Sequence, residues 1–557
     1  MLEIVTLQFG HFSNYVGAHF WNNQEEYFSF DTGQHAQEIE VLHDTLFRAG
    51  VTQSGIETYT PRLMVYDLKG GFGSIKKMNR LYDEISDYQK DCNCVSASRF
   101  HDLVVRNWKS KTYAQTPYPK NEYLQSLEEE EEKDLSAEYT NNMEIDSTER
   151  IFDLDETVKM WSDFNRIYYH PKSINTISNY QFDDELMPFD VFSYGKNAYL
   201  SQQKEEDSFE ENFRFFTEEC DAIQGFQVLT NIIDGFGGFT CSFIERLREE
   251  YPKTPVISFG ITDGQEWSPV GHHRYFKQIM NSSLSTIYLS ELSSLFIPLN
   301  VHTNLLRHGS TKFIQPTINL PYHSSCVLSA AIETSTFPFR SRRNTIHMHD
   351  FVTRLNWHGN TKIGTLGFAF PLPMSVYGDI DTQTLLPNDD RSVLNDLSLP
   401  PEPHTSKIYG QSVVVRGIPD EFRAVSGIEQ KKSSDVISDM FGRFQSLGSY
   451  SNSFFSTNVF YPIPNSFPNI FKNLNSDGYI DESAKFIDTR QIHFVPTLSH
   501  LTISTRVHKL LQNYKTELQK VNFNFFPEFG EGSEGLSSDD FIEAKELLSN
   551  LCEVYED

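Results

Sequence analysis

The sequence predicts an α/β fold whose amino-terminal part is an open, mostly parallel sheet. Leu2 to Leu7 alternates and contains β-branched residues, as a strand does, and the pattern predicts a helix from Asn14 to Trp21. Arg62 to Leu68 is a short apolar run bounded by Pro61 and by Gly70-Gly71, which is typical of a buried parallel strand. This order of strand, helix and strand, with glycine turns at the strand ends, is typical of an open α/β sheet.

Four further segments have a clear pattern. Val41–Arg48 has helical signal, and Gly50 is placed to end it. Phe239–Tyr251 has apolar residues on one face and Glu and Arg on the other, and Val256–Gly260 then has the pattern of a strand. The last segment is a carboxy-terminal helix that Ser538 or Asp539 can cap. Its apolar face consists of Phe541, Ala544, Leu548, Leu551 and Tyr555.

Residues 220–252 are the most informative stretch for function. Their pattern predicts a helix, a glycine-containing turn and a second helix. A glycine turn before a helix directs unpaired backbone N–H groups at whatever lies in front of it, which favours phosphate. Glycines before a helix are common, so the turn alone does not identify a ligand.

Composition limits the classes of partner. The formal net charge of −29 disfavours binding to nucleic acids and to a bare anionic membrane. The hydrophobic content of 38% indicates a folded globule, and the six cysteines, with Cys92 and Cys94 as ordinary thiols, indicate a reducing compartment. No apolar run approaches the roughly 18–20 residues of a transmembrane helix.

No targeting signal is evident at the amino terminus. It lacks the basic region and long apolar core of a signal peptide, and the first Lys or Arg is Arg48, whereas a mitochondrial presequence is rich in Arg. Leu2 excludes myristoylation, and the last four residues are not a prenylation box. We therefore expect the protein in the cytosol or on a surface that faces it.

Three segments have the composition of loops. Residues 128–157 carry 13 acidic side chains against Lys133 and Arg150 only, which predicts a solvated inserted loop. A docking site for a basic partner is the alternative for this acidic insertion. Residues 376–412 and 428–456, rich in Asp, Ser, Pro and Gly, are expected to be further loop expansions.

Several windows resemble the tubulin family, in the same order along the chain. Residues 220–227 (C-D-A-I-Q-G-F-Q) and 248–252 (R-E-E-Y-P) are similar to the tubulin blocks C-D-x-L-Q-G-F-Q and I-R-E-E-Y-P, which flank the phosphate loop G-G-G-T-G-[SA]-G. The other similar windows are 1–21, with M-x-E-I-V-x-x-Q-x-G; 61–71, with P-R-x-x-x-x-D-L-x-x-G; 280–285, beside tubulin Y-N-A-T-L-S; and 530–544, with G-E-G and F-x-E-A.

Longer windows resemble the Misato family, tubulin-like proteins concerned with mitochondrial distribution and inheritance. They are residues 6–17, 57–70, 119–127, 161–164, 169–174 and 234–238. The resemblance implies a tubulin-like fold of three parts. These are a Rossmann-like nucleotide-binding domain at 1–300 with the acidic insertion, an α+β intermediate domain at 301–520 with the two loop expansions, and carboxy-terminal helices at 521–557.

The resemblance also implies a site for GTP or GDP. The residues around the nucleotide would come from two amino-terminal loops, from the glycine turn and from the window beside Y-N-A-T-L-S, whose Asn contacts guanine. They are Gly10, His11, Phe12, Asp67, Lys69, Gly70, Gly71, Gly235, Gly237, Gly238 and Asn281.

The glycine turn departs from the tubulin pattern. Residues 234–240 (D-G-F-G-G-F-T) replace the phosphate loop and are one residue shorter between the flanking blocks. Phe236 and Phe239 add bulk where backbone must approach a ligand closely. Asp234 would repel phosphate, or it would cap the following turn or helix.

The groups needed for hydrolysis are altered as well. Phe12 and Ser13 follow His11, which could contact a nucleotide or be a hydrogen-bonded core histidine. Lys69 replaces a metal-holding Glu; lysine cannot ligate Mg²⁺, although it could neutralise phosphate, and a solvated side chain is the alternative. Thr353 falls where the acid that positions water would be. We therefore expect no catalytic residues and no bound metal.

The favoured hypothesis is a non-catalytic tubulin-like protein that partitions mitochondria and their DNA and supports mitochondrial distribution and morphology. It would act at the cytosolic face of the outer membrane and in the cytoplasm, through an unidentified protein of the mitochondrial surface. The alternatives are an active polymerising GTPase of the tubulin or FtsZ type, and a cytosolic adaptor of tubulin or of the chaperonin that folds tubulin. No direct nucleic-acid partner is expected.

Overall fold

A computed structural model of the chain describes most of the predicted elements. The described residues are 2–28, 40–51, 57–77, 118–137, 152–263, 272–300, 309–386, 391–399, 406–423, 431–481 and 492–556. Residues 138–151 of the expected acidic loop lie outside them. The first part of the acidic run is helical, because α3 spans Glu122–Ala137.

The amino-terminal part contains a six-stranded sheet in the order β5-β4-β1-β6-β7-β8, and every neighbouring pair is parallel. The predicted parallel α/β sheet is therefore confirmed. Such a sheet binds ligands beyond the carboxyl ends of its strands, where the strand order reverses. The strands are β1 (Glu3–Phe9), β4 (Leu63–Lys69), β5 (Ile174–Gln181), β6 (Ile223–Asn231), β7 (Val256–Thr262) and β8 (Leu295–Asn300).

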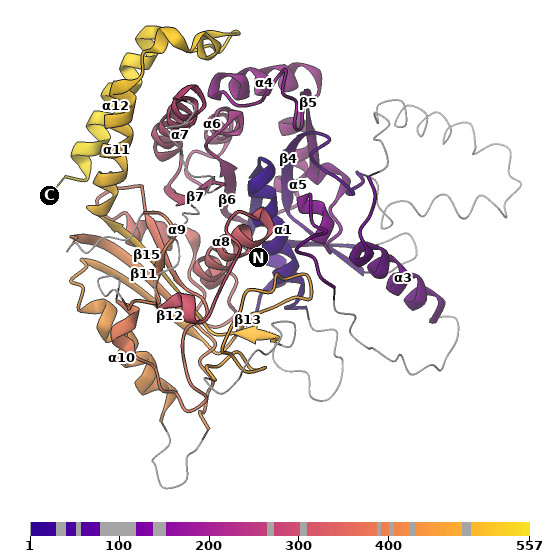
Figure 1. Cartoon of the computed structure of the whole chain (residues 1–557), viewed down its shortest axis with the longest axis vertical. Coiled ribbons are helices and arrows are strands. Elements are labelled where there is room, and N and C mark those ends of the chain that lie inside the picture. Colours follow the sequence, from indigo (N-terminus) through magenta and orange to yellow (C-terminus); the bar gives the residue numbers. More distant parts are fainter. Residues whose placement is uncertain are drawn as a thin grey trace, which may run out of the picture.

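Helices cover both faces of this sheet (Figure 1). On one side α4 packs on α6 and α6 on α7, and on the other α1 packs on α8. The bounds are α1 (His11–Glu25), α4 (Phe192–Glu205), α6 (Gly235–Glu250), α7 (His272–Leu292) and α8 (Pro321–Thr336). The remaining amino-terminal elements are the hairpin β2 (Phe47–Val51) with β3 (Glu57–Pro61), and α5 (Arg214–Glu218).

Two predicted helices are wrong. Residues 223–231 form β6, a buried strand between β1 and β7, although they were expected to be helical. The helix predicted at Val41–Arg48 is a short 3₁₀ turn at His43–Thr45, followed by β2, which pairs with β3. Pairing with another strand overrides the local pattern in both cases, with the distant β1 for β6 and with the adjacent β3 of the hairpin for β2.

A second sheet has the order β10-β9-β15-β11-β12 and is mixed, since β11 pairs with β12 in parallel and with β15 antiparallel. The loop expansions expected at 376–412 and 428–456 are therefore only partly loops. The elements are β9 (Thr365–Ala369), β10 (Asn395–Asp396), β11 (Ile408–Arg416), α10 (Ser433–Gln445), β12 (Ser451–Thr457) and β15 (Thr497–Ser504). A short ribbon, β13 (Tyr461–Pro462) with β14 (Phe494–Val495), lies outside it.

Helix α8 lies between the two sheets and is buried from Tyr322 to Thr336. Its Glu333 carboxylate accepts hydrogen bonds from Arg340, at 2.5 Å, and from Arg416 of β11. The Tyr27 hydroxyl donates to the same carboxylate at 2.8 Å and accepts from Arg416 at 2.5 Å. We call these four residues the central ionic cluster; it ties the amino-terminal helices to the second sheet.

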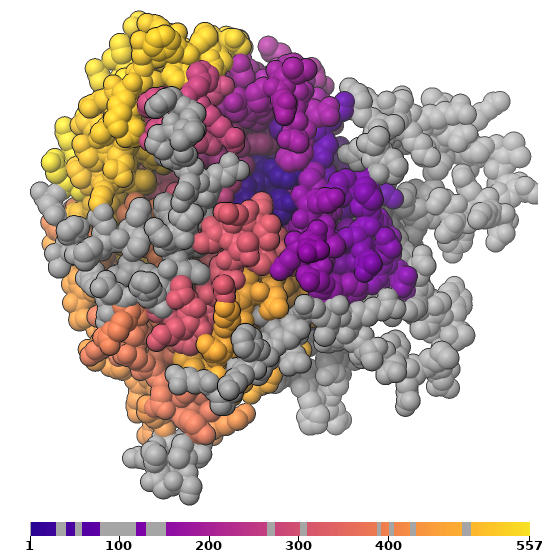
Figure 2. All heavy atoms as spheres, in the orientation of Figure 1, coloured from indigo at the N-terminus to yellow at the C-terminus, as the bar shows by residue number. Residues whose placement is uncertain are grey.

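Two carboxy-terminal helices, α11 (Arg506–Lys520) and α12 (Ser538–Val554), pack on each other and on α7. Figure 2 shows them in yellow, continuous with the amino-terminal helices along one edge. Although α11 falls inside the range assigned to the intermediate domain, its contacts place it with α12. The cap of α12 is Ser537, one residue before the predicted position.

Candidate functional site

The candidate site lies at the carboxyl ends of β1, β4 and β6. The turn after β1 supplies Gly10 to Phe12, the end of β4 supplies Asp67 to Gly71, and the turn after β6 supplies Asp234 to Gly238. Because carboxyl ends of parallel strands meet at one edge of a sheet, the fold brings these predicted residues together.

Asp67 is the most heavily bonded residue of this edge. Its side chain is fully buried, and Oδ2 lies 3.0 Å from Asn14 Nδ2, 3.0 Å from Trp161 Nε1 and 3.1 Å from His11 Nδ1. Oδ1 accepts a bond from the N–H of Leu68 at 2.8 Å. Protein donors therefore occupy a carboxylate that was predicted to face a nucleotide.

His11 and Phe12 also make internal contacts. The His11 ring lies 4.1 Å from the ring of Phe182, between centroids, and its side chain is 20% exposed. Phe12 is buried at 6% exposure. His11 is thus a hydrogen-bonded histidine at the rim of the core, in agreement with the second of the two readings given above.

Asn231, at the end of β6, holds the two turns together. Its Oδ1 accepts bonds from the N–H of Ser13 at 3.0 Å and from the Ser13 hydroxyl at 2.8 Å, and its Nδ2 donates to Asp234 Oδ2 at 3.0 Å. Gly10 has a φ of 105°, and a Cβ on it would lie 2.7 Å from the Asn231 side chain. Asn231 was not predicted as a site residue, since a single Asn at the end of a strand carries no distinctive pattern.

Asp234 caps α6, as the second reading of this residue predicted. Its Oδ1 accepts a bond from the N–H of Phe236 at 2.9 Å, and the N–H of Gly235 donates to the carbonyl of Phe189 at 3.0 Å. Burial raises the pKa of the Asp234 carboxyl to about 7, against hydrogen bonds from Asn231 and Phe236 that lower it, while Asp263 and Asp67 raise it further. The first N–H groups of the helix thus have protein partners.

The three glycines of the turn serve packing between helices. A Cβ on Gly238 would overlap the carbonyl oxygen of Phe192 in α4, and one on Gly237 would overlap the Ser285 hydroxyl of α7. A Cβ on Gly235 would lie 2.8 Å from the Phe189 ring. The same absence of side chains that suits a phosphate loop here lets α4 and α7 approach α6.

Contact of Asn281 with guanine stays a prediction, and in the structure this residue has protein partners. Asn281 is fully buried on α7; its Nδ2 donates to the carbonyls of Asp190 and Ile233, each at 2.8 Å, and its Oδ1 accepts from the N–H of Phe192 at 2.9 Å. Both N–H groups and the oxygen of the amide therefore join α7 to the start of α4 and the end of β6.

The turn after β4 contains Lys69, Gly70 and Gly71. Lys69 and Gly70 are exposed, and Gly70 has a φ of 89°, which glycine adopts without strain. Gly71 packs on Asp67, because a Cβ there would overlap the Asp67 carboxylate. Of these three residues, only Lys69 and Gly70 face solvent.

Thr353 lies on the exposed side of α9 (Met348–Leu355), and its hydroxyl donates to the carbonyl of His349 at 2.8 Å.

A loop that the sequence analysis overlooked runs along the same edge. Residues 182–189 form most of the connection from β5 to α4 and carry Asp183, Asp184 and Glu185. The N–H of Phe182 donates to the carbonyl of Lys69 at 2.9 Å, so the loop begins beside the candidate site. Its carboxylates and that of Asp67 place several acidic groups at this edge of the sheet.

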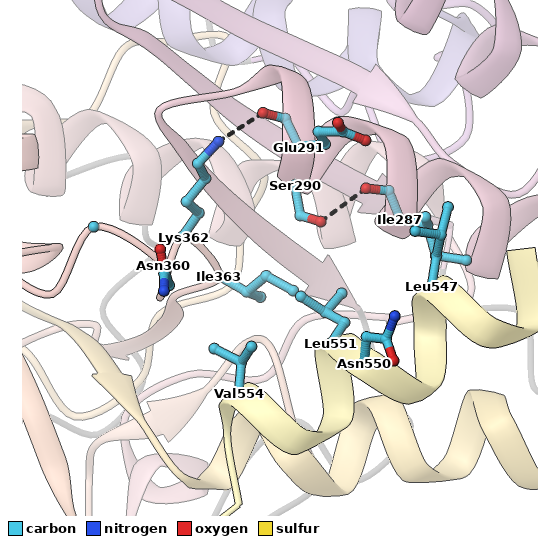
Figure 3. Close-up of a pocket in the computed structure, with 11 residues that line it drawn as sticks. Ile287, Ser290, Glu291, Asn360, Lys362, Ile363, Leu547, Asn550, Leu551 and Val554 are labelled. Carbon is cyan, nitrogen blue, oxygen red and sulfur yellow. Dashed lines mark hydrogen bonds between the residues drawn. The ribbon is translucent and has the colours of Figure 1, made fainter.

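A separate pocket lies between α7, the segment before β9 and α12, with a volume of about 300 Å³ (Figure 3). Ile287, Ile363, Leu551 and other apolar side chains form most of its wall. Lys362 Nζ donates to the carbonyl of Glu291 at 2.7 Å, beside this pocket. It contains one of the described glycines, Gly359, and no glycine-rich turn, so it does not resemble a phosphate site.

The residues at the sheet edge do not fit a guanine nucleotide in the described conformation. The helix N-terminus that would bind phosphate is capped by its own carboxylate, the guanine-contacting amide is committed, and the surrounding charges are mainly negative. Among the described residues no group of three or more His, Cys, Asp or Glu is arranged to hold a metal ion. No helix in the described part is long and apolar enough to cross a membrane.

Family models match most of the amino-terminal half. Residues 2–129 match the Misato Segment II tubulin-like domain, and residues 153–341 match a tubulin domain. Both matches agree with the six-stranded sheet and its helices.

Curated relatives extend the match over the whole chain. Protein dml1 of Aspergillus niger is 31% identical over 543 residues, which cover 94% of this chain and 93% of that protein. Protein DML1 of Gibberella zeae is 34% identical over 66% of this chain and 67% of its own length. Protein misato homolog 1 of Homo sapiens is 28% identical over 100% of this chain and 98% of its own length.

Proposed function

The chain belongs to the Misato family of tubulin-like proteins, and from this premise we propose that it acts in mitochondrial distribution and inheritance without turning over GTP. The mitochondrial part of the proposal comes from the resemblance of the sequence to this family. The absence of turnover is an inference from the sheet edge.

The observation that supports a non-catalytic role is the occupation of that edge by the protein's own groups. Asp67 is bonded to His11, Asn14 and Trp161, and the cap of α6 is Asp234. Binding a triphosphate would require breaking these buried hydrogen bonds and placing negative charge among carboxylates, at a cost of about 1–3 kcal/mol for each buried group left unpaired.

The tubulin-like block 220–227 supports the same conclusion. Residues 223–227 of the block belong to β6, where the Gln224 side chain accepts a bond from the N–H of Met348 at 2.9 Å and donates to the carbonyl of Leu2 at 3.2 Å. The likeness of this block to tubulin therefore follows from strand packing, and it does not require a nucleotide.

We place the protein in the cytoplasm and at the cytosolic face of the mitochondrial outer membrane, where it would act through protein partners. Tubulin and the cytosolic chaperonin are the candidates in the cytosol, and the partner at the mitochondrial surface is unidentified. Copurification of chaperonin subunits with the chain at native expression would support the first of these contacts.

Two measurements test the proposal. In cells that lack the protein we expect abnormal mitochondrial morphology or inheritance; normal mitochondria would contradict the mitochondrial role. Purified full-length protein is expected to release no guanine nucleotide on heating and to hydrolyse no GTP at any protein concentration. Hydrolysis that rises steeply with concentration would instead indicate a polymerising GTPase.

A further inference from the structure

The loop at residues 182–189 exposes two large apolar side chains. Leu186 is 92% exposed and Met187 is 58% exposed, and Leu186 is the most exposed large apolar residue in the described part of the chain. Single exposed apolar residues are ordinary, but two adjacent ones bordered by polar groups are typical of an interaction site.

Both ends of this loop are anchored by aromatic packing. Phe182 packs on His11, and Phe189, at 7% exposure, lies with its ring centroid 5.0 Å from that of Phe236. Between them Asp184 Oδ1 accepts bonds from the N–H groups of Leu186 at 2.9 Å and Met187 at 3.4 Å. These hydrogen bonds order the backbone of the apolar tip before binding, and a preordered segment loses less entropy when it binds.

The charged residues beside the apolar tip indicate which kind of partner the loop can bind. Asp183 and Glu185 are exposed beside the apolar tip, while Asp190, behind it, is paired with Lys277 at 3.1 Å. An anionic membrane would repel these carboxylates, whereas a protein pocket with Lys or Arg at its rim would attract them and enclose the apolar side chains.

We propose that residues 182–189 form a docking loop for a partner protein, which receives Leu186 and Met187 in an apolar pocket bordered by basic residues. The loop begins at the edge where a tubulin would hold its nucleotide. In this chain that edge therefore supports a protein contact. This inference rests on the proposed function in one respect only, since its cellular test measures mitochondrial distribution.

The first test is complementation with the full-length chain in cells that lack it. Leu186→Asp is expected to leave the amount of protein and its melting temperature unchanged and to abolish rescue of mitochondrial distribution. The matched control is Ile542→Asp, which introduces the same charge at a residue that is 55% exposed on α12, and full rescue is expected. Full rescue by Leu186→Asp would overturn the docking loop. Normal mitochondria in cells without the protein would overturn the proposed function instead.

The second test does not depend on the mitochondrial role. A photo-crosslinking amino acid replaces Met187, or Ile542 as control, in the full-length chain in cells. We expect a discrete crosslinked protein from position 187 only, reduced at least about tenfold when Asp183 and Glu185 are replaced by Lys. The absence of such a product, or one indifferent to the two charges, would overturn the proposal.

Two other binding partners of the loop, a membrane and a second copy of the chain, can each be recognised by a direct measurement. Binding of purified chain to vesicles of phosphatidylcholine and cardiolipin that is lost in Leu186→Asp would assign the loop to a membrane. Self-association in sedimentation velocity that is lost in the same variant would assign it to a second copy. Either result would overturn the assignment to a partner protein.

Discussion

The sheet edge and the central ionic cluster use buried polar groups in different ways. At the edge, Asp67 and Asp234 bind neighbours within one domain, and their hydrogen bonds close a place where related folds bind a ligand. In the cluster, one carboxylate, Glu333, holds two guanidinium groups, and Arg416 connects α8 to the second sheet. The first arrangement satisfies buried polar groups from within one domain, whereas the second pairs buried charges across two domains.

The largest expected effect is at Glu333. Burial alone would raise the pKa of this carboxyl, but Arg416 and Arg340 lower it overall, so the group is ionised. Glu333→Gln leaves two buried guanidinium groups without a countercharge, and we expect a loss of about 3–5 kcal/mol in the free energy of unfolding, measured by urea denaturation.

The control for this prediction is an exposed ion pair. Arg423 lies 3.4 Å from Asp477, and both side chains are largely in solvent. Arg423→Met should cost about 0–1 kcal/mol. Equal losses in the free energy of unfolding for Glu333→Gln and Arg423→Met would show that the cluster does not join the domains as described.

The second expected effect is at Gly238, and it separates packing from phosphate binding. Gly238→Ala forces a Cβ against the Phe192 carbonyl, which should cost about 1–3 kcal/mol of stability in the absence of any ligand. The matched control is Gly442→Ala in α10, where a Cβ meets nothing within 4 Å and a gain of about 0.5–1 kcal/mol is expected. If Gly238→Ala were neutral in urea denaturation, the turn would be free for another role.

The third prediction concerns pH at the sheet edge. The folded-state pKa of Asp234, about 7, is above the ordinary 3.8, so the native state binds the extra proton between these values. The stability contributed by this group is complete below pH 3.8 and is lost as pH rises toward 7. Asp234→Asn should remove this fall in the free energy of unfolding, measured by urea denaturation across that range. An unchanged pH slope in the variant would assign the dependence to other groups.

The regular parts of the fold were predictable because they depend on local pattern. The strand at Arg62–Leu68 and the helix after Asp234 follow from apolar periodicity, glycine position and a capping carboxylate. The strand β6 was missed because its Gln224 and Gln227 interrupt the apolar run, and only pairing with β1 and β7 makes the segment extended.

The location of the candidate site was predictable from the sequence, but the hydrogen-bond partners of its residues were not. Residues from three turns do meet at one edge, as expected of parallel strands. Sequence could not show that Asn281 is committed to Asp190 and Ile233, because its partners lie 91 and 48 residues away. Nor could the sequence show that Gly238 faces α4 and Gly237 faces α7, since helix packing depends on the whole domain.

The smallest expected effect is at Lys69, the exposed cation of the sheet edge. Lys69→Ala should change the free energy of unfolding by no more than about 0.5 kcal/mol, as for most surface substitutions. If the edge binds no nucleotide, adding GTP or GDP should leave the melting temperature of both wild type and variant unchanged, because only a ligand that binds the native state stabilises it. A rise in wild type that Lys69→Ala abolishes would mean that the edge opens to admit phosphate. The hydrogen bonds at the sheet edge would then not keep phosphate out, whereas the central ionic cluster would still join the two domains.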